Sequence, residues 1–184
     1  MPHYIAFLRA VNVGGRYAKM ADVRDCLSAS GFGDVESYIQ SGNVRMCSES
    51  TGEEVVTRNV ETALSARFGF EITALVRTPV EVAVLMTLAD DVGAPLPGDP
   101  RRYITFLRQP PAPAAAAALD GWNEPHERAQ VIGREVLTWL TIGANEAKLT
   151  NARVQRLAAT PATTRDIKVV RTLAEKWCDW QPAR

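Results

Sequence analysis

The sequence predicts an α+β protein, with a ferredoxin-like βαββαβ unit followed by a second, related α/β half. Two observations support this prediction: short apolar runs typical of strands alternate with longer runs of helical period, and both halves show nearly the same order of elements. The chain has 184 residues, of which 46% are hydrophobic and 23% charged, so it can bury a sizeable core. We expect a ferredoxin-like N-terminal domain at 1–78 and a second α+β domain with a C-terminal helix at 79–184.

The first half reads strand, helix, strand, strand, helix, strand. The continuous apolar run at its start predicts a strand that is buried on both faces, and apolar residues three to five positions apart predict the helices. The expected elements are a strand at 3–11, a helix at 20–30, strands at 35–40 and 43–47, a helix at 56–68 and a strand at 71–77. A two-residue turn at Ser41-Gly42 joins the middle strands.

The second half begins with a helix from Pro79 through Leu88 and a Pro/Gly-rich loop at 93–100, which is the expected domain boundary or loop. A strand at 103–108, a helix at 112–119, a hairpin of 129–132 with 136–140, a helix ending at Leu157 and a last helix at 165–177 complete the expected elements. This order is consistent with an internal duplication, although the halves share no visible sequence identity.

Charge balance disfavours two classes of function. The 21 basic and 21 acidic side chains cancel, whereas nucleic-acid coats and membrane-surface binders usually carry net positive charge. The charge is nevertheless uneven, because residues 51–100 carry a net −5 and residues 150–184 a net +4. We expect an anion to bind first at the positive end.

The sequence also predicts a cytoplasmic protein. The apolar opening segment is short and contains Arg9, so we do not expect a signal peptide, and no stretch has the roughly 18 apolar residues of a membrane helix. The three cysteines, Cys26, Cys47 and Cys178, have no pattern of a disulfide framework or a zinc knuckle. We expect free thiols in a reducing compartment.

A first candidate binding segment follows the opening strand, where a glycine turn leads into the first helix. Backbone N–H groups and the positive end of a helix dipole would meet there, next to basic side chains and an amide. The candidate residues are Arg9, Asn12, Gly14, Gly15 and Lys19. The alternative is an ordinary glycine-containing connection with solvated charges.

A second candidate segment is the hairpin tip, with the residues Ser41, Gly42 and Asn43. Its hydroxyl, amide and backbone donors would line the same cleft if the tip lies beside the first segment. The alternative is a turn without a ligand, because Gly and Asn tolerate the positive φ that such turns require.

A third candidate segment precedes the last helix and contains Thr163, Thr164 and Arg165. Either threonine would cap the helix, Asp166 would complement its dipole, and Arg165 and Lys168 would share one face. A capped helix start with an arginine is a suitable grip for phosphate or carboxylate. The alternative is a purely structural cap.

Several kinds of chemistry find little support in the chain. The only histidines are His3 and His126, so a serine or cysteine triad has few bases, and Ser41 is not in a nucleophile elbow. No His, Cys, Asp or Glu cluster has metal-ligand spacing, and we expect no metal site. Catalytic residues and cofactors stay unknown, and whether the chain is an enzyme stays open.

Together the segments resemble the DUF1697 family of bacterial proteins. The resemblance rests on the strand and loop Tyr4–Gly15, the helix start Lys19-Met20, the hairpin Tyr38–Asn43 and the stretch Ala162–Arg165. It implies an α+β architecture with ferredoxin-like halves and a shared patch, but no reaction. The family usually has Asn, often followed by Trp, after Thr-Thr-Arg, whereas this chain has Asp166 and Ile167.

Our main hypothesis is that the three segments converge on one cleft that holds an anionic group, such as the phosphate of a nucleotide-like small molecule. If a reaction occurs there, charge stabilisation fits better than covalent catalysis, since no activated nucleophile is visible. The alternative is an interaction module that works as a homodimer, with an Ala-rich helix at 112–119 and an exposed Trp177 and Trp180 cluster as hints. RNA binding is a weaker alternative, because the first strands lack an aromatic platform.

Overall fold

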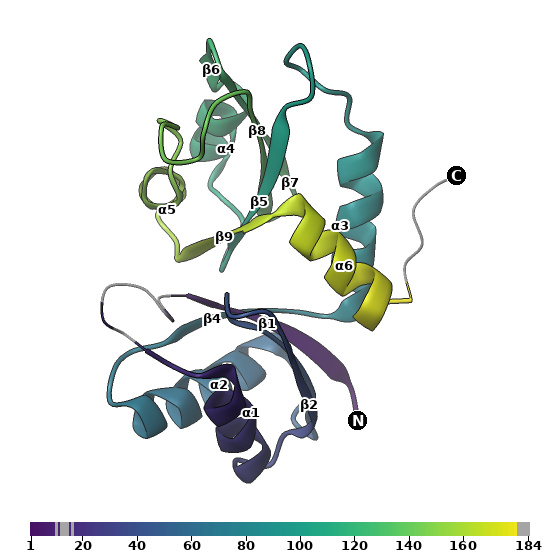
Figure 1. Ribbon diagram of the computed structural model, residues 1–184, viewed down its shortest axis with the longest axis vertical. Coiled ribbons are helices and arrows are strands. Elements are labelled where there is room, and N and C mark those ends of the chain that lie inside the picture. The colour runs from purple at the N-terminus through teal and green to yellow at the C-terminus, as the bar shows by residue number, and fades with distance from the viewer. Residues whose placement is uncertain (10, 12–14, 16, 180–184) are drawn as a thin grey trace. The chain divides into compact units, whose positions relative to one another are not determined.

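The computed structural model describes residues 1–9, 11, 15 and 17–179, and the chain divides into two compact units, Met1–Glu81 and Val82–Arg184 (Figure 1). Each unit contains one antiparallel sheet with helices packed on it, which confirms the α+β class. The domain limits expected from the sequence, 1–78 and 79–184, stay a prediction.

The first unit has the predicted βαββαβ order. Its elements are β1 (His3–Arg9), α1 (Met20–Ala29), β2 (Gly33–Tyr38), β3 (Asn43–Cys47), α2 (Glu53–Phe68) and β4 (Thr73–Arg77). The strand order is β2-β3-β1-β4, and every neighbouring pair is antiparallel. β1 therefore lies between β3 and β4, because each crossover through a helix passes over one strand.

The core of this unit lies between the sheet and its two helices, α1 and α2. Tyr4, Ala6 and Leu8 alternate along β1 and pack in one cluster with Leu27 of α1 and Leu64 of α2. The intervening residues of β1 are fully buried as well. The prediction of a strand buried on both faces is confirmed.

The hairpin between β2 and β3 differs from the prediction. β2 ends at Tyr38, so the connection is Ile39–Gly42 rather than a two-residue turn. Ile39 has a φ of 50° and Gly42 a φ of 77°. A β-branched residue at positive φ is strained, and the exposed Ile39 side chain gains little burial in return.

The helix α3 (Pro79–Asp91) connects the two units along the chain. The second unit then contains β5 (Arg101–Leu107), α4 (Pro113–Asp120), β6 (Asn123–Glu124), β7 (Glu127–Ile132), β8 (Glu135–Leu140), α5 (Asn151–Ala158), β9 (Ala162–Asp166) and α6 (Ile167–Trp177). Its strand order is β6-β7-β8-β5-β9.

The strands β6 and β9 were not predicted from the sequence. Figure 1 shows β9 beside β5 and leading directly into α6. With β9 included, the order β7-β8-β5-β9 repeats β2-β3-β1-β4 of the first unit. The second half is thus related to the first in its arrangement, and β9 is the counterpart of β4.

Helices α4 and α5 cover one face of the second sheet. Leu119 and Val154 from these helices pack with Leu107, Val136 and Ala162 from three strands. Among the described residues, no helix is both long and apolar enough to span a bilayer.

The prediction of an exposed tryptophan cluster as a dimer face is wrong for Trp177. Trp177 is 7% exposed, because it belongs to the buried stripe of α6, and Trp180 lies outside the described residues.

Candidate functional site

The first two candidate segments meet at the end of β1. A Cβ added to Gly42 would lie 2.7 Å from Cγ2 of Val11 and 2.9 Å from Cβ of Leu8, and the backbone N–H of Leu8 donates to Gly42 O at 2.7 Å. The hairpin tip therefore packs directly against the strand end from which the glycine loop leaves, and only glycine fits at this contact.

The hairpin side chains are used to hold the hairpin itself. Asn43 is fully buried, and its Nδ2 donates to Tyr38 O at 3.1 Å and to Ser41 Oγ at 2.9 Å. A buried amide with two partners stabilises the four-residue connection.

The other candidates of the first unit are placed as follows. Arg9 is the last residue of β1, opposite Thr73, and is half-buried. Lys19 is exposed at the N-cap position of α1, where its side chain makes no capping bond. Gly15 is exposed with a φ of 82°. Asn12 and Gly14 lie outside the described residues.

The third candidate segment is a strand, not the start of a helix. Thr163, Thr164 and Arg165 belong to β9, so neither threonine caps α6 and Arg165 does not share a helical face with Lys168. The cap is Asp166, whose Oδ1 accepts the backbone N–H of Lys168 at 2.8 Å. The Asp166 carboxylate thus closes the first turn of α6.

Strand alternation separates the three residues between the two faces of the sheet. Thr163 and Arg165 point to one face and Thr164 to the other. Arg165 is 7% exposed, and its Nη1 donates to Thr163 Oγ1 at 2.8 Å and to Thr164 O at 2.9 Å. Burial lowers the pKa of Arg165 to about 10, so the guanidinium still carries its charge at neutral pH.

The predicted convergence of all three segments on one cleft stays a prediction. The first two belong to the first unit and the third belongs to the second.

The second unit contains a cavity of about 680 Å³ at the start of α6, which we call the basic cavity. Its charged lining consists of four basic and two acidic side chains: Arg101, Arg102, Lys168, Arg171, Asp99 and Asp166. Lys168 and Asp166 belong to the third candidate segment, whereas the three arginines were not predicted from the sequence. The adjacent arginines after Pro100 were the available signal, together with the net positive charge of residues 150–184.

The four cations of the basic cavity differ in how they are held. Arg171 forms a two-pronged ion pair with Asp90 of α3, and Arg102 Nη1 donates to Ala89 O at 3.3 Å and lies 3.9 Å from Asp90 Oδ1. Arg101 and Lys168 are exposed, and within the described part of the chain their side chains have no ion pair. These two cations are available to a ligand.

A second cavity of about 280 Å³ lies over the same sheet, and we call it the threonine cavity. Its polar lining is Tyr103, Thr105, Thr138, Thr150, Asn151, Thr164 and Asp166. The pairing of Thr105 with Thr164 and of Tyr103 with Thr138 brings their side chains to one face. Asp166 lines both cavities.

The described residues contain no group of three or more His, Cys, Asp or Glu side chains that could hold a metal ion. All three cysteines are free thiols, as predicted.

Comparisons with known proteins agree with this architecture. The conserved bacterial protein SP0830 from Streptococcus pneumoniae has a similar fold, with a TM-score of 0.70 over 96% of this chain and 98% of that chain, at 18% sequence identity. No curated protein matches the chain in sequence. The model of DUF1697, described as a protein of unknown function, matches residues 1–137. The chain therefore belongs to the DUF1697 family.

Proposed function

We propose that the chain binds a small anionic molecule, and that the basic cavity receives its phosphate group. The observation that carries this proposal is the lining of the cavity, where two cations without ion pairs, Arg101 and Lys168, stand beside two that Asp90 holds in place. The lining side chains have a net charge of +2, which favours a ligand with one or two negative charges.

The held arginines and the available cations have different roles. Because Asp90 fixes Arg171 and Arg102, their positive charge is present in the wall without the entropy cost of ordering two long side chains. Arg101 and Lys168 retain donors that a phosphate can accept, and charge-assisted bonds of this kind contribute about 1.5 to 3 kcal/mol each.

The dimensions of the cavity point to a small molecule. A volume of about 680 Å³ lies in the range of roughly 300 to 1,000 Å³ that is usual for ligand sites. A phosphate fills only part of this space, so a phosphate-bearing molecule of nucleotide size is the best fit. The two carboxylates, Asp99 and Asp166, would accept hydrogen bonds from the rest of the ligand.

Thermal melting with a panel of phosphate-bearing compounds tests the proposal. The probes are adenosine monophosphate, inorganic phosphate and sulfate, with adenosine as the uncharged comparison. At a hundredfold excess over the dissociation constant, binding adds about 2.7 kcal/mol to the free energy of unfolding, which raises the Tm by roughly 5 to 10 °C. Adenosine, which lacks the phosphate, should raise the Tm much less than adenosine monophosphate does.

Three lysine variants locate the site. Lys168→Ala should weaken phosphate binding roughly tenfold, since it removes one charge-assisted bond. Lys176→Ala is the matched control, because Lys176 is exposed in the last turn of the same helix. Lys19→Ala tests the site expected at the glycine loop of the first unit. An equal loss of affinity in Lys168→Ala and Lys176→Ala, or a loss in Lys19→Ala alone, would refute the basic cavity as the site.

Self-association is a second candidate function, favoured by one observation. Val80, Val84 and Leu88 lie four residues apart along α3 and are 71%, 52% and 45% exposed. An exposed apolar stripe of this kind is typical of a helix that packs against a partner. Sedimentation velocity should detect a dimer that Val84→Asp abolishes, and a monomer at every concentration would exclude this candidate.

A further inference from the structure

We propose that the threonine cavity binds the sugar hydroxyls of the ligand whose phosphate occupies the basic cavity. The ligand class is then a sugar phosphate, either free or as part of a nucleotide. This inference rests on the proposed function, which it extends from the basic cavity into the second cavity lined by Asp166.

Thr138 is the first indication of a polar ligand. Its side chain lines the threonine cavity, the residue is 4% exposed, and its hydroxyl makes no hydrogen bond to any described residue. A hydroxyl that opens onto a cavity from an otherwise buried residue can donate and accept hydrogen bonds with a bound ligand. The phenol of Tyr103, opposite Thr138 in the sheet, also has no hydrogen-bond partner among the described residues.

On the side of the cavity formed by α5, β9 and β5, a chain of hydrogen bonds determines which groups donate and which accept. Asn151 Nδ2 donates to Ala162 O at 3.2 Å, so its Oδ1 faces Thr164 and accepts that hydroxyl at 3.0 Å. Since the Thr164 proton is used there, Thr105 is the donor in the 2.8 Å contact between Thr105 Oγ1 and Thr164 Oγ1. Thr105 Oγ1 then offers lone pairs to the cavity, and a hydroxyl group of a ligand can donate to them.

The charges divide the two cavities between two parts of one ligand. The threonine cavity has Asp166 as its one charged lining residue among those described, whereas the basic cavity contains four cations. A phosphate is therefore favoured in the basic cavity and repelled from the threonine cavity. Asp166 uses Oδ1 to cap α6, which leaves Oδ2 to accept a sugar hydroxyl at the boundary.

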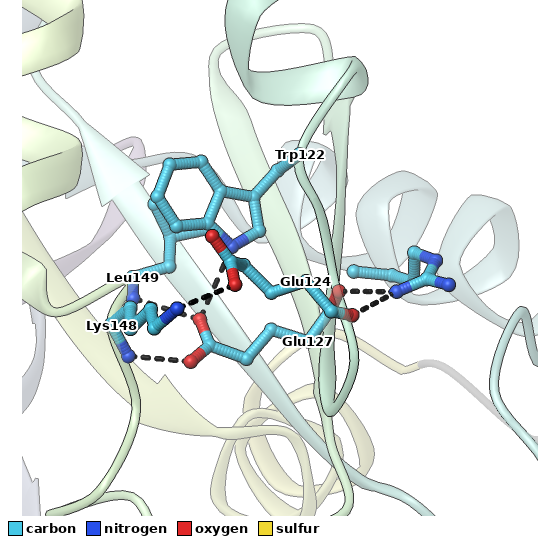
Figure 2. A network of polar contacts seen from close by, with 6 residues as sticks. Trp122, Glu124, Glu127, Lys148 and Leu149 are labelled. Atoms are coloured by element: carbon cyan, nitrogen blue, oxygen red, sulfur yellow. Dashed lines mark hydrogen bonds and ion pairs between the residues drawn. The ribbon is translucent and has the colours of Figure 1, made fainter.

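The remaining wall of the threonine cavity is apolar and is held rigidly. Leu140 and Leu149 face the cavity and would cover the C–H groups of a sugar ring. Leu149 is positioned by Glu127, a carboxylate 2% exposed in β7, whose Oε2 accepts the Leu149 N–H at 2.8 Å and the Trp122 indole N–H at 3.1 Å (Figure 2). Its Oε1 accepts the backbone N–H of Lys148. The loop wall is thus fixed before a ligand binds, which lowers the entropy cost of binding.

Calorimetric titration of the full chain with inorganic phosphate and with ribose 5-phosphate tests this inference. We expect ribose 5-phosphate to bind at least roughly tenfold more tightly than inorganic phosphate, since its hydroxyls add hydrogen bonds. Thr138→Val keeps the shape of the side chain. It should reduce the ratio of the two dissociation constants, inorganic phosphate over ribose 5-phosphate, at least threefold. Tyr103→Phe provides a second variant if Thr138→Val fails to fold.

The outcomes separate this inference from the proposed function. If inorganic phosphate and ribose 5-phosphate bind equally well and Lys168→Ala weakens both, the basic cavity stands and the sugar site is refuted. If ribose 5-phosphate binds at least roughly tenfold more tightly than inorganic phosphate but neither Thr138→Val nor Tyr103→Phe lowers this ratio of dissociation constants, the sugar binds elsewhere and the inference is also refuted. If neither compound binds, the proposed function fails and the inference fails with it. If adenine, which has neither a sugar nor a phosphate, competes with ribose 5-phosphate, the threonine cavity recognises a base and the sugar site is refuted.

Discussion

Arg171 of α6 and Asp90 of α3 form a two-pronged ion pair, with Nη2 to Oδ1 at 2.6 Å and Nη1 to Oδ2 at 3.2 Å. Both side chains are about three-quarters buried, at 27% and 23% exposure, so the pair is better shielded from solvent than an ordinary surface contact. Because Arg102 lies beside the same carboxylate, Asp90 orders two of the four cations that line the basic cavity.

Replacing this carboxylate should destabilise the protein. Asp90→Asn removes the charge that two arginines share, and we expect a loss of about 1 to 2 kcal/mol in the free energy of unfolding, between the values for surface and buried pairs. Asp91→Asn is the matched control, because the neighbouring Asp91 is exposed. Urea unfolding measures both variants, and an equal effect in the two would contradict a special role for Asp90.

The close contact at the hairpin tip predicts a large effect at Gly42. Gly42→Ala combines the strain of a positive φ with Cβ contacts of 2.7 and 2.9 Å, so we expect a loss of about 2 to 4 kcal/mol. Gly69→Ala has a similar φ of 73° and no atom within 4 Å, and should cost only about 1 kcal/mol. If the two variants have the same stability, the hairpin does not pack against β1 as described.

Glu127 should be essential to the loop that forms one wall of the threonine cavity. Glu127→Gln replaces one acceptor oxygen with an N–H₂ group that faces other donors, and we expect a loss of about 2 to 4 kcal/mol. Hydrogen exchange at the amides of Lys148 and Leu149 should become faster in the same variant. Glu146→Gln, an exposed change in the same loop, should leave both measurements unchanged. Unchanged exchange in Glu127→Gln would argue against this role.

The thiol of Cys178 should react slowly. Burial, reinforced by the nearby charge of Asp179, raises the pKa of Cys178 from 9.0 to about 12, so the thiolate is scarce at pH 8. Because a higher pKa also makes the thiolate more nucleophilic, the net effect on the rate is about thirtyfold rather than a thousandfold. Alkylation followed by mass spectrometry should find Cys178 labelled more slowly in the folded than in the urea-unfolded protein at pH 8. Equal rates would contradict the raised pKa.

The sequence predicted the first unit well because its elements have clear periodicity. Val23 and Leu27, like Val60 and Leu64, recur at helical spacing, and all four are fully buried. The hairpin connection was predicted too short, since Ile39 adopts a positive φ that no propensity favours for a β-branched residue.

β9 was missed for a different reason. Its five residues contain a single apolar side chain, Ala162, so they show no alternation. The strand forms because β5 has a free edge there and pairs with it from Tyr103 to Leu107. The β-branched Thr163 and Thr164 were a signal of strand structure, but they equally suggested a helix cap.

The basic cavity could not be predicted from local patterns. Arg101 and Lys168 are 67 residues apart in the sequence, and the pairing of β5 with β9 brings the start of one strand to the end of the other. A strand predicted to begin at Tyr103 leaves Arg101 and Arg102 in a loop. The positive charge of residues 150–184 pointed to the correct end of the chain without identifying the site.

The position of a bound anion tests the central claim most directly. A crystal structure of the chain soaked with tungstate, an electron-dense analogue of phosphate, would reveal it. We predict an anomalous peak in the basic cavity, within hydrogen-bonding distance of Lys168 Nζ and the Arg101 guanidinium. A peak at Arg9 and Lys19 instead, or a basic cavity that stays empty at a saturating concentration, would contradict the proposed function.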